Sequence, residues 1–189
     1  MLPNINSLSQ GITNNQNSYY YLWPYYPTRF DVTEKEQIFR QNIWSFKDGM
    51  VPSTFYKKIG EILKEIIDLN FEKNTEVYLC IIPASTSIKT SIRFFRFCNV
   101  AVENSNAKNG FDLIMNKTDR EATHIVDPGG AVDVLKYITI KDVLNKQIIL
   151  VDDVITRGRS YDQLSNALQK SGAKRIVGFF IGRTTHKLI

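Results

Sequence analysis

The spacing of apolar residues between positions 31 and 70 follows the period of an α-helix. Thr33 and Glu36 have the spacing of a capping box, which predicts that a first helix begins there, and Gly49 is suited to end it. A second helix is predicted over 53–70, and each helix carries one apolar stripe, as packing elements do. The stripes hold Ile38, Phe39, Ile43 and Phe46 in the first helix, and Phe55, Ile59, Ile62, Leu63, Ile66 and Ile67 in the second.

After residue 75 the pattern changes to short apolar runs bounded by turn residues, which is typical of strands. Residues 147–151 are predicted to form a buried strand, and residues 160–172 a helix that begins at Ser160 and ends at Gly172. Strands and helices that alternate on this scale predict an α/β fold with a parallel sheet flanked by helices. The other strands are predicted over 76–83, 100–103, 136–140 and 175–182, and a further helix over 92–98.

The first 30 residues have a composition of their own. Residues 1–18 are rich in Asn, Ser and Gln, which is typical of a mobile arm. Residues 19–30, YYYLWPYYPTRF, form an aromatic segment whose two prolines forbid a continuous helix. We expect this segment either to wrap onto the domain with its rings buried, or to form a lid whose rings stack on a planar ligand. The chain is therefore divided into an N-terminal arm with the aromatic segment, 1–30, and a single domain, 31–189.

Composition and charge are those of a soluble globular protein. Apolar residues make up 43% of the chain and charged residues 23%, and the net charge is +5 with a pI near 9.1. This mildly basic balance is compatible with phosphorylated ligands and with nucleic acid. Cys80 and Cys98 lie in apolar surroundings outside any CxxC pair, so we interpret them as buried free thiols. The sequence shows neither an apolar stretch of membrane-spanning length nor a secretory signal, so we expect a cytoplasmic protein without a membrane partner.

The most informative stretch is residues 148–160, IILVDDVITRGRS. A buried apolar run leads directly into two carboxylates, and in an open parallel sheet ligands bind at the carboxyl ends of the strands. In the turn that follows, Gly158 permits backbone conformations closed to other residues, while hydroxyls and the amides of a helix start suit a phosphate. The two carboxylates suit the hydroxyls of a sugar, or a divalent cation bound to that sugar. Together these features describe a site for a ribose 5-phosphate.

This spacing resembles the 5-phosphoribosyl diphosphate (PRPP) signature of type I phosphoribosyltransferases. That signature is an apolar run, two acidic residues, two apolar residues, then Thr, any residue, Gly, any residue, and Thr or Ser. The stretch fits throughout, with arginines at the two variable positions where small residues are frequent. The resemblance implies the fold of that family, and it implies that Asp152 and Asp153 act in catalysis by binding the ribose hydroxyls, with any metal reached through ribose or water. The 5-phosphate would be bound by Thr156, Arg157, Gly158, Arg159 and Ser160.

Two further loops fit the same resemblance. In this family an earlier strand ends in a loop that holds the pyrophosphate, and residues 84–91 occupy that place; the alternative is a plain connecting loop. The polar stretch around Lys117, Thr118 and Arg120 falls where the family has a mobile loop that closes over the sugar. The alternative there is a surface loop with incidental charges. The pyrophosphate-binding residues implied by the resemblance are Ala84, Ser85, Thr86, Ser87 and Lys89.

Residues 38–182 as a whole resemble the ComF-type, or amidophosphoribosyltransferase-like, group of this family, although only 148–160 is specific. Members often carry an N-terminal zinc-binding cysteine cluster, and this chain has none. Little sequence follows the last predicted strand, so any hood over the acceptor is expected from the N-terminal half. The aromatic segment 19–30 is the candidate for that hood.

The resemblance implies that an unidentified nitrogenous acceptor displaces pyrophosphate from C1 of PRPP, with Mg²⁺ as cofactor. A homodimer is expected. Two other functions stay open: a PRPP-sensing regulator without catalysis, and an accessory protein in DNA uptake or nucleic-acid handling, which the pI and the aromatic segment allow but do not favour. His124 and His186 are the only histidines. We interpret them as surface residues, with contact to the acceptor as the alternative.

Overall fold

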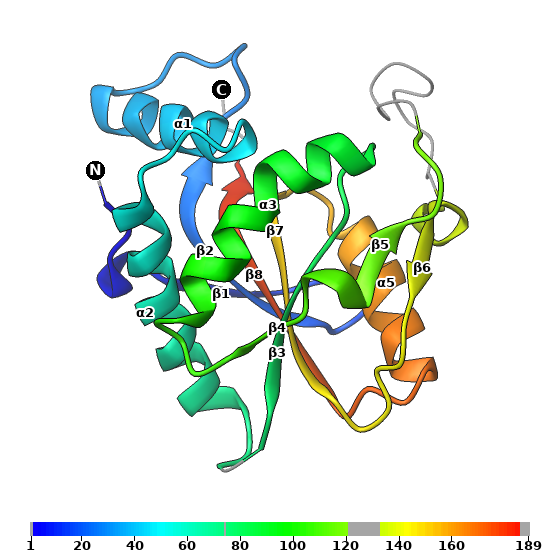
Figure 1. Ribbon diagram of the computed structural model, residues 1–189. Helices are drawn as coiled ribbons and strands as arrows, with labels where there is room; N and C mark the ends of the chain where they lie inside the picture. The colour runs from blue at the N-terminus through cyan, green and yellow to red at the C-terminus, as the bar shows by residue number, and fades with distance from the viewer. Residues whose placement is uncertain (1, 74, 121–132, 186–189) are drawn as a thin grey trace.

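The computed structural model describes residues 2–73, 75–120 and 133–185. It confirms the predicted α/β fold: a six-stranded, mostly parallel sheet lies between helices (Figure 1). The strand order is β1–β2–β8–β7–β3–β4, and β1 is the strand that runs antiparallel to its neighbour. The strands are β1 (Ser9–Ile12), β2 (Ser18–Tyr25), β3 (Val77–Ile81), β4 (Lys108–Asn109), β7 (Gln147–Ile155) and β8 (Arg175–Thr184).

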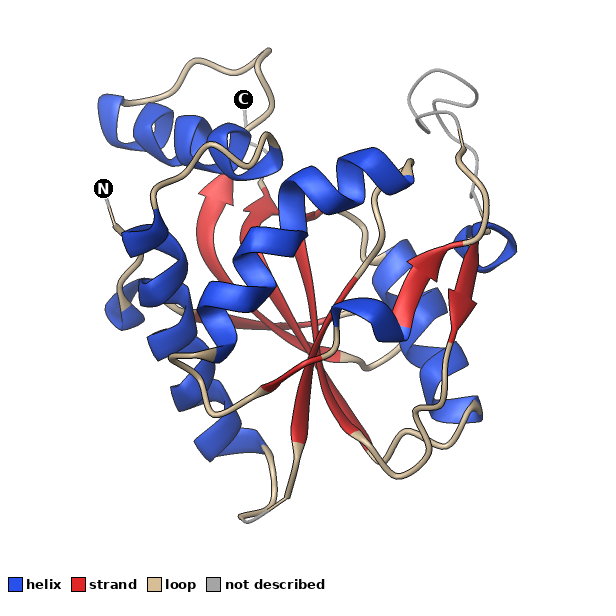
Figure 2. Ribbon diagram, viewed as in Figure 1, coloured by secondary structure: helices blue, strands red, loops and turns tan. Residues whose placement is uncertain are grey.

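Helices cover both faces of this sheet (Figure 2). The face covered by α5 also carries a small antiparallel ribbon of two strands, β5 and β6. The helices are α1 (Glu34–Lys47), α2 (Ser53–Asn70), α3 (Ser87–Val102) and α5 (Arg159–Lys170); the 3₁₀ turns are η1 (Ile5–Ser7), η2 (Phe111–Leu113) and η3 (Val134–Tyr137); and the ribbon pairs β5 (Ile114–Asn116) with β6 (Ile138–Ile140).

Each face of the sheet has its own hydrophobic core. Ile149 and Val151 of β7 point into the core beneath α1, α2 and α3. Ile148 and Leu150 point into the core beneath α5 and the β5–β6 ribbon. Because both faces of β7 are buried, its first half is a continuous apolar run rather than an alternating one. This explains why the sequence pattern marks β7 so clearly.

The two predicted N-terminal helices are confirmed. At the start of α1, Thr33 Oγ1 accepts a hydrogen bond from the Glu36 amide, and Glu36 Oε2 accepts one from the Thr33 amide at 2.7 Å. This is the capping box that the sequence predicts. Gly49 follows the helix with φ of +66°, the left-handed conformation that commonly ends helices.

The structure corrects several predicted boundaries after β3. α3 begins at Ser87, so the second half of the predicted 84–91 loop is helical. Thr86 caps this helix, since its hydroxyl accepts a hydrogen bond from the Lys89 amide. The predicted strand at 100–103 is wrong, because the buried face of α3 continues with helical spacing through Ala101. In the predicted strand 136–140 only 138–140 is extended, and β4 was not predicted.

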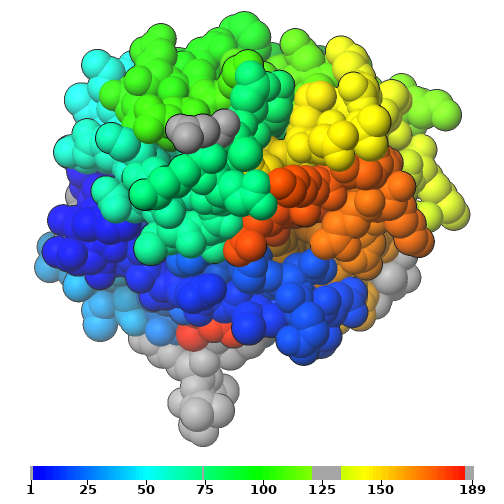
Figure 3. Space-filling model, turned by 90° about the horizontal axis from the view of Figure 1, so that it is seen from below, coloured from blue at the N-terminus to red at the C-terminus, as the bar shows by residue number. Residues whose placement is uncertain are grey.

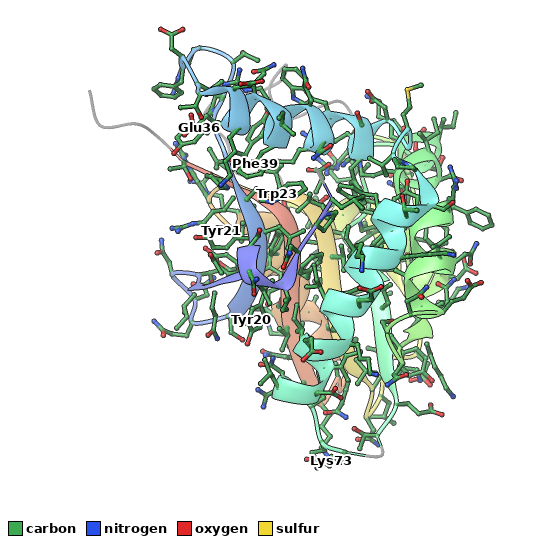
Figure 4. All side chains as sticks on the ribbon, turned by 90° about the vertical axis from the view of Figure 1, so that its left-hand side faces the viewer. Tyr20, Tyr21, Trp23, Glu36, Phe39 and Lys73 are labelled. Carbon is green, nitrogen blue, oxygen red and sulfur yellow. The ribbon has the colours of Figure 1, made fainter. Side chains whose placement is uncertain are left out.

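Residues 18–25 form β2, an inner strand of the sheet, rather than a segment wrapped onto its surface. β2 pairs in parallel with β8, and β1 pairs with residues 18–21 of β2. Pro24 lies beyond that pairing, where one side of β2 is an edge and a missing N–H is tolerated. Trp23 is buried and stacks on Phe39 of α1 at 5.0 Å between ring centroids (Figure 4). The arm predicted over 1–18 likewise contains β1, so it is built into the sheet.

The structure also bears on the predicted free thiols and on the search for membrane-spanning segments. Cys80 and Cys98 are buried free thiols, as predicted, and burial raises the pKa of Cys80 to about 12, so neither thiol is poised to ionise near neutral pH. Among the helices of residues 2–73, 75–120 and 133–185, none has the length and apolar character needed to cross a bilayer.

Candidate functional site

Asp152 and Asp153 lie near the carboxyl end of β7. Side chains alternate along a strand, so Asp153 shares the side of Ile149 and Val151 and points toward α1 and α3. Asp153 is only 5% exposed, whereas the side chain of Asp152 keeps 22% of its surface exposed. One carboxylate is therefore held within the protein and the other is open to a ligand.

Two cations from different helices meet these carboxylates. Arg93 of α3 forms an ion pair with Asp153, and its Nη1 lies 3.7 Å from Asp152 Oδ1. Lys47 of α1 places its Nζ 3.8 Å from Asp153 Oδ1. Neither cation stands out in the sequence, because each comes from a distant element. Arg93 could have been predicted from its position. A carboxylate buried at a strand end needs a cation, and Arg93 lies one helical turn after Lys89.

Partial burial and the negative charge of Asp153 together raise the pKa of Asp152 to about 7, although Arg93 opposes both effects. Asp152 also acts on Arg120: burial lowers the pKa of the Arg120 guanidinium, and the charge of Asp152 raises it. The structure thus brings one of the predicted loop residues into the field of the carboxylates. With this raised pKa, Asp152 gains and loses its proton near neutral pH, as functional carboxyl groups often do.

Residues 156–158 form the turn from β7 into α5, and Arg159 and Ser160 are the first two residues of that helix. Gly158 is the N-cap of α5 and has φ of +73°, so the loop uses the left-handed conformation that glycine permits. Within the described residues, the amides of residues 157–161 donate to no protein acceptor. Thr156 Oγ1 lies 2.8 Å from Thr184 Oγ1 at the end of β8. Unpaired amides at a helix start, together with hydroxyls, form an anion-binding geometry.

The loop after β3 lies beside the carboxylates because Ile81 pairs with Val151, and the Ile82 amide donates to the Val151 carbonyl. Thr90 holds this loop in place: its hydroxyl accepts a hydrogen bond from the Ala84 amide at 2.9 Å and donates to Asn116 Oδ1 at 2.8 Å. Asn116 in turn donates to the Ala84 carbonyl. The predicted pyrophosphate residues are thus a fixed loop, Ala84–Thr86, followed by the exposed first turn of α3 with Ser87 and Lys89.

Residues 117–120 lie against that loop. The amides of Lys117 and Thr118 donate to the Tyr137 carbonyl, so these two residues are tied to η3. Asp119 Oδ1 accepts a hydrogen bond from the Ser87 amide at 2.8 Å, and the Arg120 amide donates to the Ser85 carbonyl at 2.8 Å. Arg120 is therefore brought to the candidate site. The rest of the predicted mobile loop lies outside the described residues, as do His124 and His186.

α1 and the loop before it lie over the carboxyl ends of β2 and β8 (Figure 1). Lys47 connects this cover to the site, since it contacts Asp153 and lies 5.8 Å from the ring centroid of Tyr25. Of the aromatic segment, Tyr19 and Trp23 are core residues, whereas Tyr25 ends β2 at the candidate site. Arg40 is buried and fixes the loop by donating to the carbonyl oxygens of Tyr26, Pro27 and Phe30.

The resemblance implies Mg²⁺, and the carboxylates at the end of β7 can be compared with the ligands that this ion prefers. Within the described residues there is no group of three or more acidic, cysteine or histidine side chains that could hold a metal ion by themselves. Mg²⁺ commonly binds through one or two carboxylates and takes its other ligands from water and substrate phosphates. Asp152 and Asp153 fit this mode, with the partly exposed Asp152 as the accessible oxygen donor.

No family model matches this chain, and a search of curated proteins gives no match. Similar solved structures include a hypoxanthine-guanine phosphoribosyltransferase from Bacillus anthracis with a HEPES molecule in the active site, 15% identical over 74% of this chain and 77% of that one, with a TM-score of 0.46. The HGPRT-ase from Leishmania tarentolae in complex with GMP is 15% identical over 79% and 72%, with a TM-score of 0.35. The allosteric regulatory enzyme of purine biosynthesis is 14% identical over 73% of this chain and 30% of its own, with a TM-score of 0.41. The function proposed below rests on the site itself.

Proposed function

We propose that this chain binds PRPP and transfers its phosphoribosyl group to a nitrogenous acceptor, with release of pyrophosphate. The observation that carries the proposal is at the end of β7. Two carboxylates there are separated by two residues from a loop that turns at Gly158, and within the described residues the amides of 157–161 have no protein acceptor. A phosphate and a sugar diol are bound by different chemistry, and this short stretch offers both kinds at adjacent positions. The loop after the neighbouring strand β3 supplies a third group of donors beside the same carboxylates.

In the proposed reaction the lone pair of the acceptor nitrogen forms a bond to C1 of the ribose. The C1–O bond breaks, and its electron pair leaves on an oxygen of pyrophosphate, while the proton lost by the nitrogen goes to pyrophosphate or to water. The sugar develops positive charge on the way, and the carboxylates of Asp152 and Asp153 stabilise that charge. Bound Mg²⁺, held through these carboxylates and the substrate, would neutralise charge on the leaving diphosphate.

The remaining roles follow from position. Thr156–Ser160 hold the 5-phosphate, and Ala84–Ser87 with Lys89 hold the pyrophosphate. α1 and residues 26–33 serve as the hood, because they cover the carboxyl edge and reach Asp153 through Lys47. Exclusion of water matters here, since water would otherwise compete with the acceptor for C1. Membership of the ComF-type group and the homodimer stay predictions, and the acceptor is left as an unidentified nitrogen compound.

The proposal is tested by calorimetry of PRPP binding in the presence of Mg²⁺. Asp152→Asn and Asp153→Asn should each weaken binding by about 1.5–3 kcal/mol, because each removes a charged hydrogen-bond acceptor. Asp68→Asn on the exposed face of α2 is the matched control and should bind as the wild type does. Circular dichroism establishes that each variant is folded. Wild-type affinity in both site variants would refute the proposal.

A PRPP sensor without catalysis is the second candidate, and one observation favours it. Arg93 and Lys47 already neutralise the carboxylates that a sugar or a metal would use. A panel of bases and amines, assayed for release of pyrophosphate from PRPP, separates the two functions. Binding of PRPP with no pyrophosphate release from any acceptor would identify the sensor.

A further inference from the structure

A hollow of about 430 Å³ lies between residues 156–160, the phosphate loop, and residues 13–17, the tip of the β1–β2 hairpin. The hairpin belongs to the N-terminal segment, for which the sequence predicts no part in phosphate binding. The hollow is lined from one side by Thr13, Asn14 and Asn15 of the hairpin, and from the others by Arg157, Arg159 and Arg183.

The hairpin tip is fixed to the first turns of α5, the helix whose N-terminus forms the phosphate loop. Thr13 Oγ1 donates a hydrogen bond to Asp162 Oδ1 at 2.6 Å, and Asn17 Nδ2 donates to the same oxygen at 2.7 Å. Tyr161 adds a third link by donating to the Ser18 carbonyl at 2.6 Å. Figure 3 shows the N-terminal segment, in blue, alongside α5, in orange. Thr13 and Asp162 are both buried, so this attachment is part of the folded core and not a surface contact.

The hairpin also packs directly on the loop. A Cβ built on Gly158 would lie 2.9 Å from Thr13 Cγ2, closer than real side-chain contacts. Gly158 therefore serves two purposes, the left-handed turn and the close approach of the hairpin. The position of Thr13 in this way determines the shape of the wall that a phosphate in the loop would meet.

The charge of the hollow is strongly positive. Within the described part of the chain, Arg157, Arg159 and Arg183 form no ion pair with a carboxylate. The guanidinium carbon of Arg183 lies 5.6 Å from the ring centroid of Tyr21, a cation–π contact at the end of β8. Among the described residues that line the hollow, Asp162 is the one with a carboxylate, and its Oδ1 already accepts hydrogen bonds from the hairpin. An anion is the ligand that this hollow favours.

We infer that the β1–β2 hairpin is the outer wall of the 5-phosphate site and that Arg183 is a further phosphate-binding residue. The inference rests on the proposed function and deepens it. Three guanidinium groups and the amides of a helix start suit the fully ionised form of a phosphate monoester, the terminal group of ribose 5-phosphate. The N-terminal hairpin is then a part of the substrate site, although it is more than 130 residues away from the loop in sequence.

Arg183 is tested by calorimetry with ribose 5-phosphate at pH 5.5 and pH 7.5. Arg183→Gln should weaken binding by about tenfold at pH 7.5, where the phosphate carries its second charge, and by less at pH 5.5. Arg175→Gln is the matched control, because it makes the same change at the opposite end of β8. Equal affinities of the two variants at both pH values would overturn the role of Arg183.

The wall is tested by filling the hollow. Asn15→Trp places a large ring at an exposed hairpin position that lines it, whereas Gln10→Trp places the same ring on β1 away from it. Asn15→Trp should lose ribose 5-phosphate binding by at least about tenfold and keep the wild-type melting temperature. Unchanged binding in Asn15→Trp, with wild-type binding intact, overturns this inference alone. Absence of ribose 5-phosphate and PRPP binding in the wild type overturns the proposed function, and the inference with it.

Discussion

Arg93, in the second turn of α3, forms an ion pair with Asp153, the buried second carboxylate of β7. The two residues meet because β3 and β7 are neighbours in the sheet, so the helix that follows β3 runs across the carboxyl end of β7. Arg93 thereby joins two parts of the proposed site. It belongs to the helix that follows the proposed pyrophosphate loop, and it contacts the carboxylates proposed to hold the ribose. A ligand that binds both would have to share Asp153 with Arg93.

We expect Arg93→Gln to destabilise the protein by about 3 kcal/mol. Removal of Arg93 leaves the buried Asp153 carboxylate with only the more distant Lys47, at 3.8 Å, as a cation among the described residues, which is costly in a poorly solvated site. Urea unfolding monitored by fluorescence measures the effect. Arg96→Gln, at an exposed position of the same helix, is the control and should cost no more than about 1 kcal/mol. Equal urea midpoints for the two variants would show that Arg93 does not stabilise Asp153.

Stability should fall as the pH rises from 4 toward 7. Burial and the neighbouring charge of Asp153 raise the pKa of Asp152 from its ordinary value of 3.8 to about 7, so the folded chain binds this proton more tightly than the unfolded chain does. The contribution is fully present below pH 3.8 and is lost as the pH rises through the folded pKa, with a slope of at most about 1.4 kcal/mol per pH unit. In Asp152→Asn this slope should disappear. Urea unfolding at pH 5.0 and pH 7.5 gives the comparison, and an unchanged slope in the variant would contradict it.

The sequence predicts those parts of the fold whose signals are local. The capping box of Thr33 and Glu36 lies within one turn, and the continuous apolar run of β7 reports burial on both faces. The left-handed Gly158 was also predictable, because the strand-to-helix turn of three residues, 156–158, leaves few other conformations. The last two of these features, β7 and Gly158, position the carboxylates and the phosphate-binding turn of the candidate site.

The parts that escaped prediction depend on contacts between distant residues. β2 contains Pro24 and a run of aromatic residues, and only its pairing with β8 identifies it as a strand. Arg93 and Lys47 look like ordinary helix-surface cations until the sheet places Asp153 beneath them. The end of α3 was misassigned because β-branched residues at 100 and 102 suggest a strand, while the buried helical face outweighs that preference.

Gly158→Val should damage phosphate binding more than Arg157→Ala does. The left-handed φ of +73° costs a β-branched residue on the order of 1–3 kcal/mol, and the new side chain would also collide with Thr13. Arg157 contributes charge to the loop and no backbone shape. Calorimetry with ribose 5-phosphate ranks the two variants, and stronger binding by Gly158→Val than by Arg157→Ala would show that loop shape is not what holds the phosphate.

Asp119→Asn should raise the affinity of the chain for inorganic diphosphate. Asp119 Oδ1 accepts the hydrogen bond of the Ser87 amide at the start of α3, where the proposed pyrophosphate site has its helix-start donor. A diphosphate that uses this amide must displace the carboxylate and suffers its repulsion until it does. An asparagine keeps the shape and can still accept the bond, so the change removes charge alone. We expect diphosphate to bind about fivefold tighter, which corresponds to about 1 kcal/mol.

The same substitution should lower the free energy of unfolding by about 0.3–1 kcal/mol, because a negative charge near a helix N-terminus is stabilising. Opposite signs of the two effects separate competition from general damage to the fold, which would weaken both stability and binding. Asp112→Asn, an exposed acid on η2, is the control and should change neither quantity. Calorimetry with diphosphate and urea unfolding of the same samples provide the pair of measurements. If diphosphate binds more weakly to Asp119→Asn than to the control, Asp119 is a structural cap of α3 and does not compete with the ligand.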